Sequence, residues 1–83
     1  KSMELTYSES NQIVYLTIGA AKPLVRRLRA GWKSWQEVTF QHDGKRYRGQ
    51  VSDMVFLHVQ PGHWYCTIVL LEPPSMISGK RES

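Results

Sequence analysis

Lysine and arginine side chains, which bind phosphates and carboxylates, are concentrated in one part of this sequence. Eight of the eleven cationic residues lie in the window 22–48, where only Glu37 and Asp43 oppose them. Eight positive and two negative charges give this window a net charge of +6, whereas three positive and five negative charges leave the rest of the chain at −2. Such asymmetry is typical of a surface that meets a polyanion.

The cationic window also contains aromatic residues, and nucleic-acid-binding surfaces use this combination. Arginine and lysine contact phosphates and release counterions, while exposed aromatic rings stack on unpaired bases. An acidic protein would be bound by the same cations. The alternative is a purely structural role for these residues. In that interpretation the cations complement a helix dipole or keep an exposed strand soluble, and the tryptophans pack in the core. The candidate contact residues are Arg26, Arg27, Arg29, Lys33, Arg46 and Arg48, with Trp32 and Trp35 as candidate stacking groups.

The histidines near the end of the chain do not make up a metal site. His58 and His63 flank a predicted turn and would be diagonal neighbours on one strand face. A metal needs a third and usually a fourth ligand, and Cys66 is predicted to point to the other face. We therefore predict no metal and no cofactor. Cys66 is the single cysteine, so an intrachain disulfide is excluded and a reducing, cytoplasmic compartment is expected.

Catalytic motifs are not evident either. His42, Glu37 and Arg48 could be drawn as the acid–base set of a small ribonuclease, but His42 and Glu37 are predicted to face opposite sides of a sheet. The sequence has no P-loop, dinucleotide fingerprint, paired carboxylates or metal-spaced cysteines. We expect a protein that is not an enzyme. No apolar run approaches the length of a membrane helix, so no membrane partner is expected.

The clearest structural element is a hairpin that would carry part of the cationic window. The runs 37–42 and 45–51 alternate in polarity around Asp43-Gly44, a pair that favours a type I′ turn because both central residues need positive φ. The turn places His42 opposite Lys45, and it gives the hairpin one basic, solvent-facing side. Its opposite side is apolar and consists of Val38, Phe40, Tyr47 and Val51.

The stretch 54–71 predicts a second tight hairpin, on which the rest of the fold has to be organised. Pro61-Gly62 suits the central positions of a type II turn, which would place Val59 opposite Trp64 and Leu57 opposite Cys66. Both faces of this hairpin are mostly apolar, so both need cover. Either the sheet curls around them or two copies pair across a two-fold axis, and we expect a homodimer.

The remaining elements are two N-terminal strands and one short helix. Strands are predicted over 4–7 and 12–18. Pro23 favours the first position of a helix, Gly31 is interpreted as its C-terminal stop, and residues 32–35 would then link it to the sheet. The apolar stripe Leu24, Val25 and Leu28 must dock on the sheet, which turns the helix arginines outward.

The sequence thus predicts an α+β fold: a strongly twisted antiparallel β-sheet, formed as a meander with two tight hairpins, plus one short helix. A small SH3-like barrel with an inserted helix is the alternative. We expect a single compact domain over residues 3–74 and a flexible C-terminal tail over 75–83. The expected function is a small binding domain whose basic face engages nucleic acid, as an accessory or regulatory factor. The alternative is a protein-interaction module or inhibitor that docks an acidic partner protein.

Overall fold

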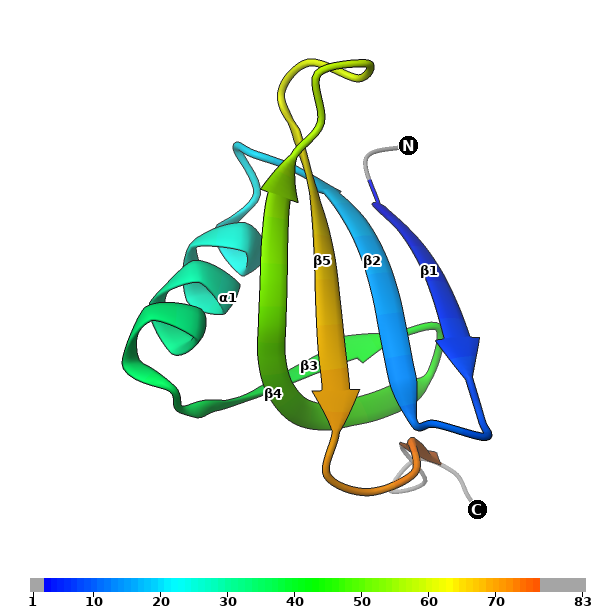
Figure 1. Ribbon diagram of the computed structural model, residues 1–83. Helices are drawn as coiled ribbons and strands as arrows, with labels where there is room; N and C mark the ends of the chain where they lie inside the picture. The colour runs from blue at the N-terminus through cyan, green and yellow to red at the C-terminus, as the bar shows by residue number, and fades with distance from the viewer. Residues whose placement is uncertain (1–2, 77–83) are drawn as a thin grey trace.

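The fold is a curled antiparallel sheet with one helix, as seen in a computed structural model that describes residues 3–76 (Figure 1). The sheet order is β1-β2-β5-β4-β3, and β6 pairs with β4 beyond the end of β5. The predicted α+β class with a strongly twisted antiparallel sheet is confirmed, and the sheet has the shape of a half-barrel. The elements are β1 Met3–Ser8, β2 Ile13–Gly19, α1 Pro23–Ser34, β3 Glu37–His42, β4 Lys45–Phe56, β5 His63–Leu70 and β6 Ser75–Met76.

The curl of the sheet comes from β4, a twelve-residue strand that serves both hairpins. Its first half pairs with β3 and its second half with β5, and the register shifts between Val51 and Asp53. A bulge of this kind bends a strand and increases its twist. In Figure 1, β4 bends near the bottom of the view, and its first half runs with β3 behind the rest of the sheet. The strand therefore continues from the first hairpin into the second through a bulge at Ser52 and Asp53, without a turn.

The core fills the inner side of the curl. Alternate residues of β2, β3 and β5 are buried, so the side chains on one face of each strand point inward. Val14, Leu16 and Ile18 of β2 are almost completely buried and meet Cys66 and Ile68 of β5. The predicted apolar side of the first hairpin, Val38, Phe40, Tyr47 and Val51, belongs to this core.

The helix closes one side of the half-barrel and is longer than the sequence predicted. It begins at Pro23, as expected, but it continues to Ser34 and ends with Trp35 in the left-handed conformation. Gly31 is not the stop. A Cβ at this position would lie 2.5 Å from Val38 Cγ1, so glycine allows the helix to pack closely on β3. No helix within residues 3–76 has the length and apolar character needed to cross a membrane.

The β3–β4 hairpin forms as predicted. Asp43 and Gly44 have φ values of 54° and 76°, the positive values that a type I′ turn requires. His42 pairs with Lys45, and the predicted register continues along the strands to Glu37 and Gln50. This hairpin therefore presents Thr39, Gln41, Arg46 and Arg48 away from the core side of the sheet.

The register of the β4–β5 hairpin differs from the prediction by three residues. Phe56, and not Val59, lies opposite Trp64, and Met54 lies opposite Cys66. The predicted Pro-Gly turn is present, because His63 N–H donates to Gln60 O at 3.2 Å and Gly62 has a φ of 80°. The strands, however, end at a six-residue loop, Leu57–Gly62, which projects beyond the sheet in Figure 1.

This register shift reverses the two faces of β4, since side chains alternate along a strand. Met54 is buried, whereas Val55 is exposed and Val59 in the loop is 93 % exposed. Curling of the sheet thus covers Met54 but leaves Phe56 and Val69 exposed. We call the side of β2, β4 and β5 that faces away from the core the outer face; it carries Tyr15, Val55, Tyr65 and Val69.

The C-terminal part of the described chain returns to the first hairpin. Ser75 and Met76 pair with Arg46 and Lys45, which places β6 beside the tip of that hairpin. The rest of the predicted tail, 77–83, lies outside the described residues.

Candidate nucleic-acid interface

The cationic residues of the described chain lie on two neighbouring structural units. Residues 3–76 contain eight lysines and arginines, all of them on α1, at its N-cap Lys22, or in the first four residues of β4. The strands β1, β2 and β5 carry none. The helix packs against both β3 and β4, the two strands of the first hairpin. We call the predicted contact set the basic surface: Arg26, Arg27, Arg29, Lys33, Arg46 and Arg48.

The helix distributes its cations over three directions. Val25, Leu28 and Gly31 are buried, which fixes the side of the helix that faces the core. With 100° between successive residues, Arg26 and Lys33 lie on the opposite side, and Arg27 and Arg29 lie on the two flanks. The predicted outward direction is thus correct for the three helix arginines, and Lys33, which was expected in the linker, is also exposed on the helix; the four cations do not share one face.

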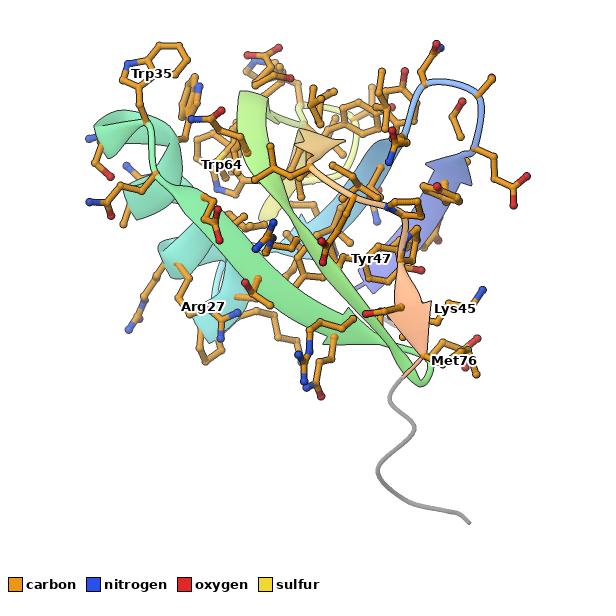
Figure 2. All side chains as sticks on the ribbon, turned by 90° about the horizontal axis from the view of Figure 1, so that it is seen from below. Arg27, Trp35, Lys45, Tyr47, Trp64 and Met76 are labelled. Carbon is orange, nitrogen blue, oxygen red and sulfur yellow. The ribbon has the colours of Figure 1, made fainter. Side chains whose placement is uncertain are left out.

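Arg27 joins the helix to the hairpin. Its Nη2 donates a hydrogen bond of 2.5 Å to the backbone oxygen of Thr39. Because β3 is the last strand of the sheet, that carbonyl lies on an edge where no other strand of residues 3–76 pairs. A cation at such an edge satisfies the acceptor and discourages pairing with another chain. Figure 2 shows Arg27 beside β3, so this helix cation reaches the hairpin that carries Arg46 and Arg48.

Arg29 is directed to the other flank of the helix. Its guanidinium carbon lies 5.5 Å from the centre of the Trp64 ring, within the range of a cation–π contact. Trp64 in turn packs edge-to-face on Phe56, with ring centres 5.4 Å apart. Arg29 therefore belongs to an aromatic cluster near the start of β5, away from Arg27.

Arg48 is partly neutralised by its own surroundings. Nη1 lies 3.8 Å from Glu37 Oε2, and Nη2 lies 3.5 Å from Glu72 Oε1. The Nε atom is buried and has no hydrogen-bond partner within the described residues. Two carboxylates beside one guanidinium leave little net positive charge at this position. Arg48 thus ties β4 to β3 and to the segment after β5.

Three of the predicted contact residues have no such intramolecular partners. Arg26, Lys33 and Arg46 are exposed, and none forms a salt bridge or a side-chain hydrogen bond within residues 3–76. Lys45 was not among the predicted contacts, although its place beside the Asp43-Gly44 turn was a signal. It is exposed near the tip of the hairpin (Figure 2).

The two candidate stacking groups have different environments. Trp32 is half-buried and packs against the core, as the structural alternative for this residue supposed. Trp35 follows the last turn of α1, and its side chain is 72 % exposed. Figure 2 shows its ring projecting from the end of the helix. Only one of the two tryptophans is therefore accessible to a ligand over most of its surface.

The titratable groups show no constellation for catalysis or metal binding. Burial raises the pKa of the Cys66 thiol to about 12, so the thiolate that a nucleophile needs is not formed near neutral pH. His58 lies in the loop and His63 opens β5, so the predicted diagonal pair on one strand face is wrong. Within residues 3–76, no three His, Cys, Asp or Glu side chains gather as metal ligands. The open hollow lined by Tyr7, Glu9, Gln12 and Pro73 brings no acid–base pair together.

The chain matches no known protein-family model, no curated protein and no solved structure at a significant level. Its function has to be inferred from its own residues and their arrangement.

Proposed function

We propose that this protein is a small non-enzymatic domain that binds nucleic acid through the basic surface, as an accessory or regulatory factor. The observation that carries the proposal is the separation of charge. Every lysine and arginine of residues 3–76 lies on or next to α1 or on the first half of β4, and Arg27 of α1 hydrogen-bonds to β3, the strand that pairs with that half. A polyanion is attracted to such a surface regardless of sequence.

The cations would divide their roles. Arg26, Lys33 and Arg46 are exposed without intramolecular partners, so they are the residues that would contact phosphates. Arg27 and Arg29 are held by Thr39 and Trp64, so they would mainly shape the surface and add to its potential, whereas Arg48, beside two carboxylates, would only shape it. Neutralising three phosphates predicts that the logarithm of the binding constant for duplex DNA falls with log salt at a slope of about −3.

Fluorescence anisotropy tests this proposal with labelled oligonucleotides of random sequence, both single- and double-stranded, at two salt concentrations. The triple variant Arg26→Ala, Lys33→Ala, Arg46→Ala should lower affinity about tenfold or more, because it removes the three predicted contact residues that are exposed and have no intramolecular partner. A matched control is Thr6→Glu, Ser10→Glu, Asn11→Glu, which changes the net charge by the same −3 at exposed positions on and after β1. The control should bind nearly as well as the unchanged protein.

The results of this titration distinguish nucleic acid from an acidic protein as the partner. Absence of binding, or binding that does not weaken with salt, would remove the nucleic-acid proposal. Equal losses in the triple variant and its control would show that only net charge matters and that the surface is wrongly chosen. Poly-glutamate, tested in the same assay, represents an acidic protein; if it binds more tightly than the oligonucleotides, the alternative of a module or inhibitor that docks an acidic protein is favoured.

We also propose that the protein is located in the cytoplasm, a reducing compartment, and that it forms a homodimer. Cys66 is a buried free thiol, which suits a reducing compartment. The outer face leaves Val55, Tyr65 and Val69 exposed, and apolar residues gathered in this way often mark an interface. A dimer through this face would double the number of exposed cations. Light scattering that reports the mass of one chain at tens of micromolar would exclude it.

A further inference from the structure

Trp35 is the most exposed aromatic residue of the described chain, and it is not among the residues that form the core or pack against it. Its side chain is 72 % exposed, against 40 % for Phe56 and 36 % for Tyr65. The other two tryptophans are half-buried and pack against the core. Trp35 forms no aromatic pair and no cation–π contact within residues 3–76. Tryptophan is enriched at binding interfaces, where its ring contacts a partner, and an exposed ring outside the core suits such a role.

The backbone of Trp35 strengthens this point. Its φ of 59° and ψ of 35° lie in the left-handed region, where glycine or asparagine is normally found at the end of a helix. A tryptophan at this position is disfavoured by the contact between its Cβ and the backbone. Glycine would therefore end the helix at least as well. The fold needs the left-handed conformation at position 35, but it does not need the indole.

Three hydrogen bonds hold this backbone in place. The N–H of the Trp35 cap and the N–H of Gln36 both donate to Gly31 O, the latter at 3.0 Å. Gln50 Nε2 donates to Trp35 O at 2.8 Å, which anchors the residue to β4. The indole therefore projects from a fixed backbone position, at the end of a helix that carries the exposed cations Arg26 and Lys33. An exposed ring on the same element as exposed cations suits a site where bases stack and phosphates are bound.

We propose that Trp35 stacks on an unpaired base, so that the nucleic acid bound by the basic surface is single-stranded. This inference rests on the proposed function and specifies its ligand. The flat faces of bases are covered by their neighbours in a duplex, whereas a single strand can turn one base onto the indole while its phosphates follow Lys33 and Arg26. Stacking of this kind tolerates every base, so little sequence preference is expected.

The test compares a 20-residue oligothymidylate with an abasic oligonucleotide of the same length, which has the same phosphates and no bases. The full-length protein should bind the oligothymidylate about five- to 100-fold more tightly, and its tryptophan fluorescence should be quenched only by that ligand. Trp35→Ala should abolish the preference and the quenching. Trp35→Phe should keep part of the preference, because phenylalanine also presents an aromatic face.

A second measurement excludes a structural role for the ring. Trp35→Gly should raise the thermal midpoint of unfolding, since glycine relieves the left-handed conformation. Trp35→Asn, which also adopts this conformation readily, should melt no lower than the unchanged protein. If both variants melt at lower temperatures, the ring supports the fold and the inference is wrong.

The outcomes separate this inference from the proposed function. If the protein binds neither oligonucleotide and no duplex either, both fail. If it binds both equally, or if Trp35→Ala weakens the two by the same factor, the basic surface remains a nucleic-acid site but Trp35 is not a stacking group. Tighter binding of duplex than of single strands would overturn the inference in the same way.

Discussion

The two hairpins that share β4 are closed in different ways, and the difference decides what each presents to solvent. The β3–β4 hairpin turns in two residues, Asp43 and Gly44, and its strands pair up to the turn. The β4–β5 hairpin turns at Pro61-Gly62, but its strands stop pairing earlier and leave the loop Leu57–Gly62. One hairpin carries cations on a face of fixed register; the other carries an exposed apolar face and a projecting loop.

Turn geometry accounts for this difference. The backbone twist of a type I′ turn matches the right-handed twist of the strands it joins, so pairing continues to the turn. A type II turn twists the other way and would splay the strands. At the second hairpin three further residues, His58 to Gln60, take up that mismatch, and Leu57 N–H reaches His63 O at 2.9 Å to close the loop. A tight turn thus fixes register only when its handedness suits the strands.

The largest effect is expected where the two hairpins meet, at Gly49. This residue pairs with Val38 on one side and Leu70 on the other. A Cβ there would lie 2.5 Å from Val69 O and 2.9 Å from Leu70 Cα, which are backbone atoms that cannot move independently. Gly49→Ala should lower the free energy of unfolding by about 3 kcal/mol or more. Urea denaturation measures it, and a loss below 1 kcal/mol would show that the two hairpins are not rigidly joined.

An effect of intermediate size is expected when the glycine of each turn is replaced. Gly44 and Gly62 have similar positive φ values, and a Cβ would meet no atom at either position. Gly44→Ala should cost about 1–2 kcal/mol of unfolding free energy, because a two-residue turn cannot relax. Gly62→Ala should cost less, since the six-residue loop can redistribute its dihedral angles. Equal costs in denaturant titrations would contradict the distinction between the hairpins.

The smallest expected effect is a loss of unfolding free energy at alkaline pH, and a different buried titratable group contributes to it in each hairpin. Burial raises the pKa of Cys66, on β5, from 9.0 to about 12, and burial is also the main cause that raises the pKa of Tyr47, on β4, above 10.0. Groups whose pKa is higher in the folded state contribute stability below their unfolded pKa and lose it as pH rises toward the folded value. At pH 10 the Cys66 thiol should account for a loss on the order of 1 kcal/mol relative to pH 8.

The variants Cys66→Ala and Tyr47→Phe test this assignment by urea denaturation at both pH values. Cys66→Ala should flatten the decline between pH 8 and pH 10, although it is less stable at each. Tyr47→Phe should leave most of the decline in place, because the Tyr47 phenol that this variant lacks ionises at higher pH. An unchanged decline in Cys66→Ala would show that the buried thiol is not responsible.

Much of the fold could be predicted from local sequence. Asp43-Gly44 specified a turn and a register through dihedral angles that few residues adopt, and Pro23 marked the start of α1. The stop at Gly31 was wrong because that glycine serves a contact with Val38, a residue close in space that no local rule reveals. The register around Pro61-Gly62 was wrong because the turn type is evident from sequence while its fit to the strand twist is not.

The candidate site was predictable in composition but not in arrangement. Counting charges identified the window that holds all eight cations of the described chain. It could not show that Arg27 caps a strand edge, that Arg29 covers Trp64, or that Glu72 reaches Arg48. Nor could it distinguish Trp32 from Trp35, since one more turn of helix carries Trp32 into the core and leaves Trp35 outside.

The sequence by itself determined the class of fold, the first hairpin and the separation of charge, since alternation, turn dihedral angles and residue types act over a few neighbouring positions. Only the tertiary structure decided which cations remain free, which tryptophan is exposed and which face of β4 is buried. Those outcomes depend on a bulge, a close helix–strand approach and contacts between residues distant in the chain. Each is a property of packing in space, and no short stretch of sequence contains it.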